Sequence, residues 1–243
     1  MIYRYRRNSA HMCGRFAVKT PAKDIARIFR ATGTPPEVRP RFNLTPSADV
    51  LCLRFNPQDG LRHLDLLHWG LVPIWAKDAA IGNKLTNARA ESVAEKPSFR
   101  DAFAKRRCII PADAFYEWQK TDGGKQPYAM VPSGAAAAQS NEPPLFAFAG
   151  LWERWKHPAS GDILRSCAII TTSANAVLAP IHDRMPVILD AAHWGQWLGD
   201  EAADQDELLA LLKPAPPDSL RAYPISSRVN SPKFDDESLL VAV

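Results

Sequence analysis

Short apolar runs separated by turn residues dominate this chain, and they predict more strand than helix. Residues 50–55 and 64–69 flank the turn Asn56-Pro57-Gln58-Asp59-Gly60, which predicts a hairpin. Further strands are expected at 108–110, 114–119, 128–131, 145–152, 164–172, 187–189 and 220–225. Helices with one apolar face are expected at 21–29, with Thr20 as the cap and Pro21 at the first helical position, and at 98–105, 191–198 and 206–212.

The order of these elements predicts the fold class and the domain organisation. Strands and helices do not alternate as they do in parallel βαβ units, so we expect an α+β fold. It would be a single mixed domain with mainly antiparallel, barrel-like sheets flanked by short helices. The low-complexity stretch 132–144 is interpreted as an insertion loop, because strand patterns lie on both sides of it. The domain is expected at 13–235 with a tail at 236–243, and the protein is expected to be a monomer.

Residues 1–12 (MIYRYRRNSAHM) are treated separately. They have no apolar centre, so they do not form a secretory signal. Ala10-His11-Met12 is typical of a tag remnant or an over-extended start, and a native basic leader is the alternative. If these residues are removed, Cys13 becomes the first residue of the chain.

Composition excludes several classes of protein. With 46% hydrophobic and 23% charged residues the chain is typical of a globular protein, and no apolar run reaches the roughly 18 residues of a membrane span. The four cysteines are scattered without a CxxC pair, so neither the usual zinc site nor a disulfide scaffold is predicted, and a cytoplasmic location fits. The net charge of +4 permits an anionic partner without requiring one.

Cys13 is the most informative residue, because its chemistry depends on its position. As the first residue it would carry an α-amine and a thiol, and such an aminothiol can condense with an aldehyde and close a five-membered thiazolidine ring. An internal cysteine has no amine for this reaction. Cys52, Cys108 and Cys167 are interpreted as small buried hydrophobes.

Two further residues could move protons. Glu117 lies among aromatic residues, which would raise its pKa and suit a general acid or base, but a surface glutamate on an alternating strand fits the pattern equally. His182 could act as a proton shuttle, oriented by Asp183, or could be a hydrogen-bonded structural histidine.

Binding residues are suggested nearby, each with a structural alternative. Asn87 could orient an amine or a sugar hydroxyl, or cap a turn. Arginines next to the candidates suggest phosphate binding, because a guanidinium matches phosphate bidentately. Those arginines are Arg15, Arg89 and Arg184. Trp69 and Trp75 could be stacking platforms for bases or part of the core.

Taken together, several segments resemble the SOS response-associated peptidase (SRAP) family, whose members sense abasic sites and crosslink to single-stranded DNA. The segments are residues 12–16 (MCGRF), 41–46 (RFNLTP), 69–73 (WGLVP), 86–91 (TNARAE), 107–111 (RCIIP), 115–118 (FYEW), 182–186 (HDRMP) and 229–230 (VN). They follow the family order over nearly the whole chain.

The resemblance implies a role in DNA repair and the SOS response, with a basic groove for single-stranded DNA containing abasic sites. Cys13 would be the nucleophile that forms a thiazolidine, Asn87 would position substrate and amine, and Glu117 would be the acid and base. His182 would assist ring opening and crosslink reversal. The implied DNA contacts are Arg15, Arg89, Arg184, Trp69 and Trp118.

The resemblance also implies a peptidase activity that removes the residues ahead of the cysteine, with hydrolase-type and possible lyase-type chemistry. No metal or organic cofactor is expected, and the protein would associate with the nucleoid when bound to DNA. Two alternatives remain at this point. One is an N-terminal-nucleophile amidohydrolase, which also begins Cys-Gly, and the other is a non-covalent single-stranded DNA-binding module.

Overall fold

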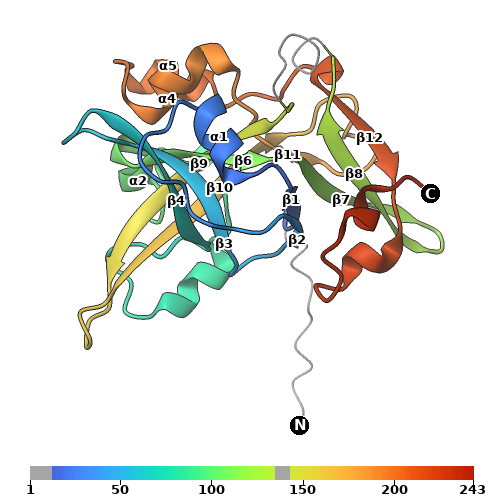
Figure 1. Ribbon diagram of the computed structural model, residues 1–243, viewed down its shortest axis with the longest axis horizontal. Coiled ribbons are helices and arrows are strands. Elements are labelled where there is room, and N and C mark those ends of the chain that lie inside the picture. Colours follow the sequence, from blue (N-terminus) through green and yellow to red (C-terminus); the bar gives the residue numbers. More distant parts are fainter. Residues whose placement is uncertain (1–12, 135–142) are drawn as a thin grey trace.

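A computed structural model describes residues 13–134 and 143–243, and the predicted leader at 1–12 lies outside the described residues. Two sheets make up the fold (Figure 1). One has the order β11 (Arg184–Pro186), β10 (Ile163–Ser173), β4 (Leu61–Trp69), β3 (Asp49–Asn56), β6 (Arg107–Ala112) and β9 (Phe146–Lys156), with β5 (Asn87–Arg89) paired to β10. The other has the order β12 (Leu220–Pro224), β8 (Gly124–Pro132), β7 (Ala114–Thr121), β1 (Phe16–Val18) and β2 (Arg41–Leu44).

The first sheet closes on itself. Strand β10 pairs with β4 on one side and with β9 on the other, so β10, β4, β3, β6 and β9 form a five-stranded barrel. Closure leaves these strands without open edges. Most pairings are antiparallel, but β10 runs parallel to β4 and β5. The predicted α+β class with barrel-like, mainly antiparallel sheets is confirmed.

Short helices surround the sheets. They are α1 (Ala22–Ile28), α2 (Arg100–Lys105), α4 (Trp194–Leu198) and α5 (Gln205–Ala210), with 3-10 turns at Ala79–Lys84, Ala90–Ser92, Ala191–His193, Pro217–Ser219, Ser227–Asn230 and Glu237–Leu240. Helix α1 buries Ala22, Ile25 and Ala26, as the apolar spacing predicts. It begins one residue later than expected, because Pro21 is the N-cap and the hydroxyl of Thr20, the predicted cap, donates to Asp113 instead. No helix in the described part of the chain is long and apolar enough to cross a membrane.

One predicted strand is displaced. The strand expected at 187–189 is found at Arg184–Pro186, where it pairs with the end of β10. Val187 and Leu189 are buried, and Ile188 makes an isolated bridge to Phe148 outside the strand. The apolar pattern at 187–189 therefore indicated residues that pack in the core, but the paired strand begins three residues earlier, at Arg184.

Aromatic side chains join the two sheets. Phe16 of β1 packs edge-on against Trp69 of β4, with ring centroids 5.0 Å apart, and against Phe148 of β9. Phe115 of β7 packs edge-on against Phe146 and Phe148. Edge-to-face pairs of this kind add to the energy of burial alone. The starts of β1 and β7 are thereby held against the barrel.

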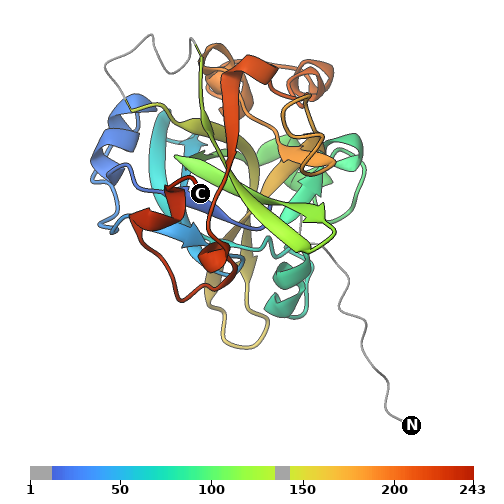
Figure 2. The ribbon, with the colours of Figure 1, turned by 90° about the vertical axis from the view of Figure 1, so that its right-hand side faces the viewer.

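The chain continues to pack after residue 235, where a tail was predicted. Leu239 is fully buried in a small cluster with Tyr116 and Val229, and Ala242 bridges to Ile225. Figure 2 views the molecule from the side of β7, β8 and β12, where this C-terminal segment lies. Residues 236–243 are therefore part of the folded domain in the structure.

Candidate active site

The pairing of β1 with β7 brings Cys13 to Glu117. Phe16 pairs with Phe115, and the Tyr116 amide donates to the Arg15 carbonyl at 3.0 Å. This register places the nitrogen of Cys13 2.6 Å from Oε1 of Glu117, across 104 residues of sequence. The Cys13 thiol also hydrogen-bonds to Glu117. One carboxyl group therefore contacts both groups of Cys13 that could react.

Both residues are removed from water. Cys13 is 3% exposed and Glu117 is 2% exposed. Burial raises the pKa of the Glu117 carboxyl, and this is only partly opposed by the charge of His182 and by the hydrogen bonds from Cys13. Burial, followed by the Glu117 charge, raises the pKa of the Cys13 thiol. A carboxyl group with a raised pKa next to a protonated thiol is suited to passing protons near neutral pH.

Cys13 has an uncommon backbone conformation, with φ of 45°. Residues with a side chain rarely adopt the left-handed region, and such strain tends to occur at functional sites. Here it accompanies the approach of the Cys13 nitrogen to Glu117.

His182 is the third member of this cluster. Its charge acts on Glu117, so the imidazole lies close to that carboxyl. The His182 Nδ1 accepts from the Arg184 amide at 3.1 Å, and Oδ1 of the exposed Asp183 is also 3.1 Å from Nδ1. The structure therefore brings Cys13, Glu117 and His182 together, as expected if they act as a unit.

Asn87 and Arg89 lie on a short strand that pairs with β10 beside the barrel. They are on β5, whose parallel pairing with β10 sets Asn87 opposite Ile169. Because side chains alternate along a strand, Asn87 and Arg89 share one face while Ala88 is buried on the other. Asn87 donates to Oγ1 of Thr86 at 3.3 Å, and the Arg89 side chain is exposed. Arg89 is thus open to an anionic ligand.

Arg184 is engaged with protein groups. Its guanidinium forms a bidentate ion pair with Glu91, at 2.5 and 2.9 Å, and donates to the Thr171 carbonyl at 2.7 Å. The side chain is 12% exposed. Its positive charge lowers the pKa of the Cys13 thiol, against the larger effect of burial. Arg184 therefore acts on the site electrostatically, and a phosphate would have to compete with Glu91 for it.

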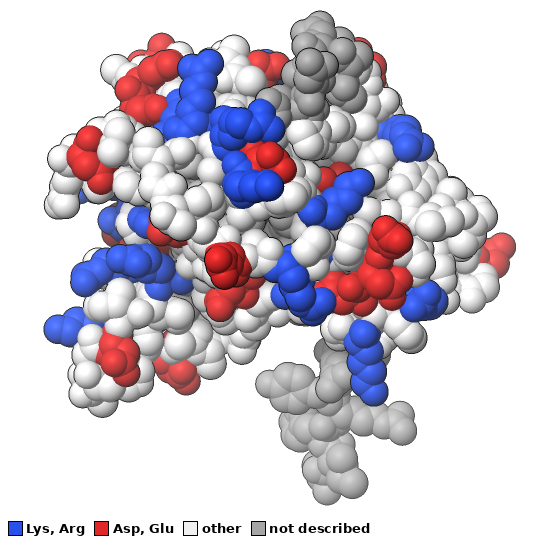
Figure 3. Space-filling view, in the orientation of Figure 1, with Lys and Arg blue, Asp and Glu red and all other residues white. Residues whose placement is uncertain are grey.

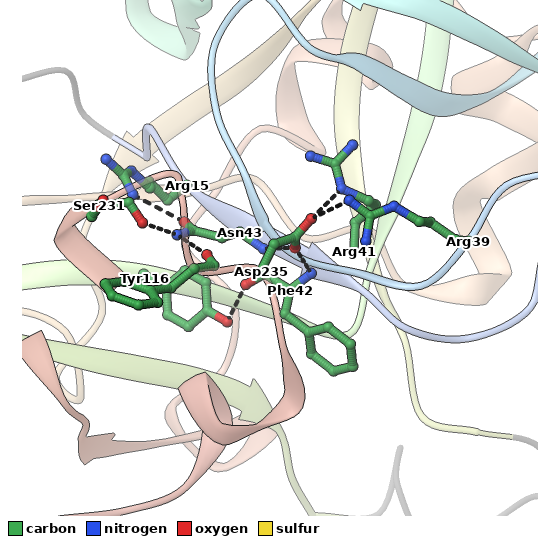
Figure 4. A network of polar contacts seen from close by, with 9 residues as sticks. Arg15, Arg39, Arg41, Phe42, Asn43, Tyr116, Ser231 and Asp235 are labelled. Carbon is green, nitrogen blue, oxygen red and sulfur yellow. Dashed lines mark hydrogen bonds and ion pairs between the residues drawn. The ribbon is translucent and has the colours of Figure 1, made fainter. Parts of the chain in front are cut away.

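Arg15 is held by Asn43 and by residues 229 and 230 (Figure 4). Its guanidinium donates to Oδ1 of Asn43 at 3.0 Å and to the carbonyls of Val229 and Asn230. The Trp118 indole donates to Oδ1 of Asn230 at 2.7 Å. Arg15, which directly precedes β1, and Trp118 on β7 are thus both held by Asn230.

The three tryptophans considered as base contacts, Trp69, Trp75 and Trp118, differ in exposure. Trp69 is 0% exposed and its indole donates to the Thr86 carbonyl at 3.0 Å, so the expectation that it contacts a base is corrected: no face of the ring is accessible. Trp75 is 54% exposed beside Ile74, which is 57% exposed, and Trp118 is partly exposed. Stacking on a base requires an accessible ring, and Trp75 is the most exposed of the three.

Charge on the face shown in Figure 3 is mixed. Lys and Arg side chains are spread over it with Asp and Glu between them, and no single basic patch dominates. No cluster of three or more potential metal ligands is found among residues 13–134 and 143–243.

Comparison with known proteins places this constellation in a family. Residues 12–232 match the family model of SOS response associated peptidase (SRAP). The chain belongs to the SRAP family. Cys13, Asn87, Glu117 and His182 all lie within the matched range.

The alignments with SRAP relatives cover most of this chain and most of each relative. It is 44% identical over 232 residues to the abasic site processing protein YoqW of Bacillus subtilis (strain 168), covering 94% of this chain and 99% of that protein. It is 32% identical to the abasic site processing protein HMCES of Gallus gallus, covering 96% of this chain and 78% of that protein. A crystal structure of a Bacteroides thetaiotaomicron protein matches with a TM-score of 0.82 at 25% identity, covering 95% of this chain and 100% of that chain.

Several residues of the site escaped sequence reasoning. Glu91 pairs with Arg184 across 93 residues, and Asn43 and Asp235 hold the support of Arg15. Glu91 and Asn43 lie inside segments 86–91 and 41–46 that carried the SRAP resemblance, so the signal was present without a role attached to it. Asp235 had no such signal.

Proposed function

We propose that this SRAP protein processes abasic sites in single-stranded DNA and captures them as a covalent thiazolidine through Cys13. The 2.6 Å contact between the Cys13 nitrogen and Glu117 carries the proposal, because it holds the amine-forming nitrogen and the thiol at one proton-transfer group. The names of relatives such as YoqW and HMCES support abasic sites as the substrate.

The reaction is a condensation that releases one water. With Cys13 as the first residue, its amine attacks the aldehyde carbon of the ring-opened abasic sugar to give a carbinolamine. Glu117 donates a proton to the departing hydroxyl, and an imine forms. The thiol then adds to the imine carbon, and its proton passes through Glu117 to the nitrogen. A carboxyl group with a raised pKa can serve both steps.

The other residues support this chemistry in the proposal. His182, close to Glu117, assists opening of the sugar ring and reversal of the adduct, and Asn87 positions the substrate and the amine. Arg89 provides an accessible contact for a flanking phosphate, and exposed indoles such as Trp118 contact bases. Arg15 and Arg184 are already hydrogen-bonded to protein groups. We therefore propose that flanking phosphates contact only the parts of the two guanidinium groups that these partners leave accessible.

The proposal requires removal of residues 1–12. With them attached, the Cys13 nitrogen is an amide and cannot condense with an aldehyde. We propose that hydrolysis of the Met12–Cys13 bond by the protein itself supplies the free amine, using the same thiol and carboxyl group. Intact-mass spectrometry of the purified chain, with Cys13→Ala as the control, tests this: loss of the segment must depend on Cys13.

The decisive experiment compares a chain that begins at Cys13 with its Cys13→Ala and Cys13→Ser variants. Each is mixed with a single-stranded oligonucleotide containing one abasic site and run on a denaturing gel after heating. We expect a heat-stable adduct only with Cys13. An adduct that needs borohydride would indicate an imine without ring closure, and equal adduct from Cys13→Ala would refute the proposal. Binding without any adduct would indicate a non-covalent module.

A further inference from the structure

A polar network lies beside the proposed site and touches none of its reacting atoms (Figure 4). Its centre is Asn43 on β2, which is 2% exposed. The Asn43 side-chain amide lies within hydrogen-bond distance of the carbonyls of Val229, Ser231 and Phe234, at 3.2, 3.1 and 2.8 Å. These residues belong to one segment, 229–235, which we call the C-terminal strap. A single buried side chain therefore fixes the strap along most of its length.

Asp235 fixes the far end of the strap to the same strand. Its Oδ1 accepts from the amides of Phe42 and Asn43, at 2.5 and 2.9 Å. Its Oδ2 pairs with Arg41 at 2.5 Å and with Arg39 at 3.3 Å. Charge-assisted hydrogen bonds of this kind are roughly twice as strong as neutral ones. The strap is thus tied to β2 by both a neutral and a charged anchor.

The strap in turn holds two residues of the proposed site. The Val229 and Asn230 carbonyls accept from the guanidinium of Arg15, which is two residues after Cys13. The Asn230 side chain accepts from the indole of Trp118, which follows Glu117. Asn43 also accepts from Arg15 directly, at 3.0 Å. Loss of the Asn43 contacts would therefore release Arg15 and Trp118 together.

We propose that Asn43 is a positioning residue for DNA binding, which acts through the C-terminal strap on Arg15 and Trp118. This inference rests on the proposed function, because it takes those two side chains as DNA contacts. It assigns a role to a buried residue that contributes no group to the chemistry. It also separates Asn43 from a purely structural asparagine, whose loss would lower stability without changing how DNA is bound.

Adduct formation at increasing DNA concentration gives the main test, using chains that begin at Cys13. Asn43→Ala is expected to raise the half-saturating DNA concentration about tenfold, while the rate at saturation stays within about twofold. A tenfold loss of affinity corresponds to the loss of about one or two hydrogen bonds. Asp235→Asn is expected to raise the half-saturating DNA concentration by a smaller factor. Asp236→Asn is the matched control, because the Asp236 side chain hydrogen-bonds to Ser238 and Arg228 and to no residue of β2 among those that the structure describes.

Two further variants show whether the strap carries the effect. Asn43→Asp keeps an acceptor for Arg15 but turns a carboxylate towards the three strap carbonyls, so we expect it to bind DNA as weakly as Asn43→Ala. Parental binding by Asn43→Asp would overturn the inference. Adding Arg15→Ala to Asn43→Ala should change binding by less than about twofold, because coupled residues are not additive. Multiplicative losses would also overturn it.

A readout without DNA separates this inference from the proposed function. In ¹⁵N–¹H spectra the indole cross-peak of Trp118, assigned by its loss in Trp118→Phe, should move in Asn43→Ala and stay in place in Asp236→Asn. An unmoved cross-peak refutes the positioning role whatever the protein does to DNA. If the parental chain forms no adduct while the cross-peak moves, the proposed function fails and the strap's hold on Trp118 stands. Should Asn43→Ala not fold, Asp235→Asn answers the same question.

Discussion

Two buried glutamates in this protein have opposite surroundings. Glu153 on β9 is 4% exposed and is neutralised by Arg106, whose guanidinium lies 2.7 Å from it, and it also accepts from the Arg154 amide at 2.8 Å. Glu117 on β7 is 2% exposed and contacts the nitrogen and thiol of Cys13. No lysine or arginine forms an ion pair with Glu117 in the part of the chain that the structure describes.

The difference shows how a buried carboxyl group can be recognised as functional. Burying a charge is costly unless it is paired, so a paired glutamate such as Glu153 is explained by the fold itself. Glu117 lacks this compensation, and its raised pKa is the physical result. A buried carboxyl group with a raised pKa and no cationic partner is a candidate for a functional role, and the role that we propose for Glu117 is proton transfer.

The largest expected effect is on the rate of adduct formation. Glu117→Gln should slow it by about 100-fold, because an amide cannot pass protons in either step. Glu153→Gln should leave it within about twofold, since Glu153 is paired on the barrel. Single-turnover rates on an oligonucleotide with one abasic site measure both. Equal slowing by the two substitutions would mean that buried carboxyl groups affect the site only through the fold.

For stability, we expect Glu153→Gln to have the larger effect of the two substitutions. Glu153→Gln should lower the free energy of unfolding by about 2 kcal/mol, because Arg106 is left without its counter-charge. Glu117→Gln should not lower it at neutral pH, because it replaces an uncompensated buried acid with a neutral side chain of the same size. Urea unfolding at pH 7 gives both values. A larger loss in Glu117→Gln would show that Glu117 is needed for packing.

The smallest expected effect is a dependence on pH. The folded chain holds the Glu117 proton more tightly than the unfolded chain does, since burial raises its pKa above the ordinary 4.5. The folded state therefore binds more protons above that pH, and this contribution to stability falls as the pH rises. The Tm of Glu117→Gln relative to the parent should increase from pH 4.5 upwards and then level off. A difference that shrinks with rising pH would contradict the sign of the shift.

Local features of the fold could be predicted from the sequence, and long-range closure could not. The hairpin of β3 and β4 and the helix α1 were correct because turn residues and apolar spacing act over a few residues. The parallel pairing of Asn87 with Ile169 joins strands about 80 residues apart, and no local pattern encodes it. Barrel closure depends on the same kind of contact.

The sequence predicted which residues belong to the candidate site better than it predicted their contacts. Cys13, Glu117 and His182 could be named because reactive side chains within apolar segments are unusual, and the structure places them together. Whether an arginine is free could not be inferred, because Arg184 meets Glu91 only after folding. Nor could the sequence separate Trp69 from Trp75, which flank one turn-rich segment and differ completely in exposure.

Strand β10 has a consequence for how the sequence can change. Over Ile169, Thr171 and Ser173 it pairs with Asn87, Arg89 and Arg184. Cys13 and Glu117 belong to the other sheet and do not depend on this register. Inserting or deleting one residue within 169–173 would turn alternate side chains to the opposite face. Such a shift would leave Cys13 and Glu117 in place but disturb the pairing that positions Asn87, Arg89 and Arg184. We therefore expect this stretch to tolerate exchanges of residue type far better than changes of length.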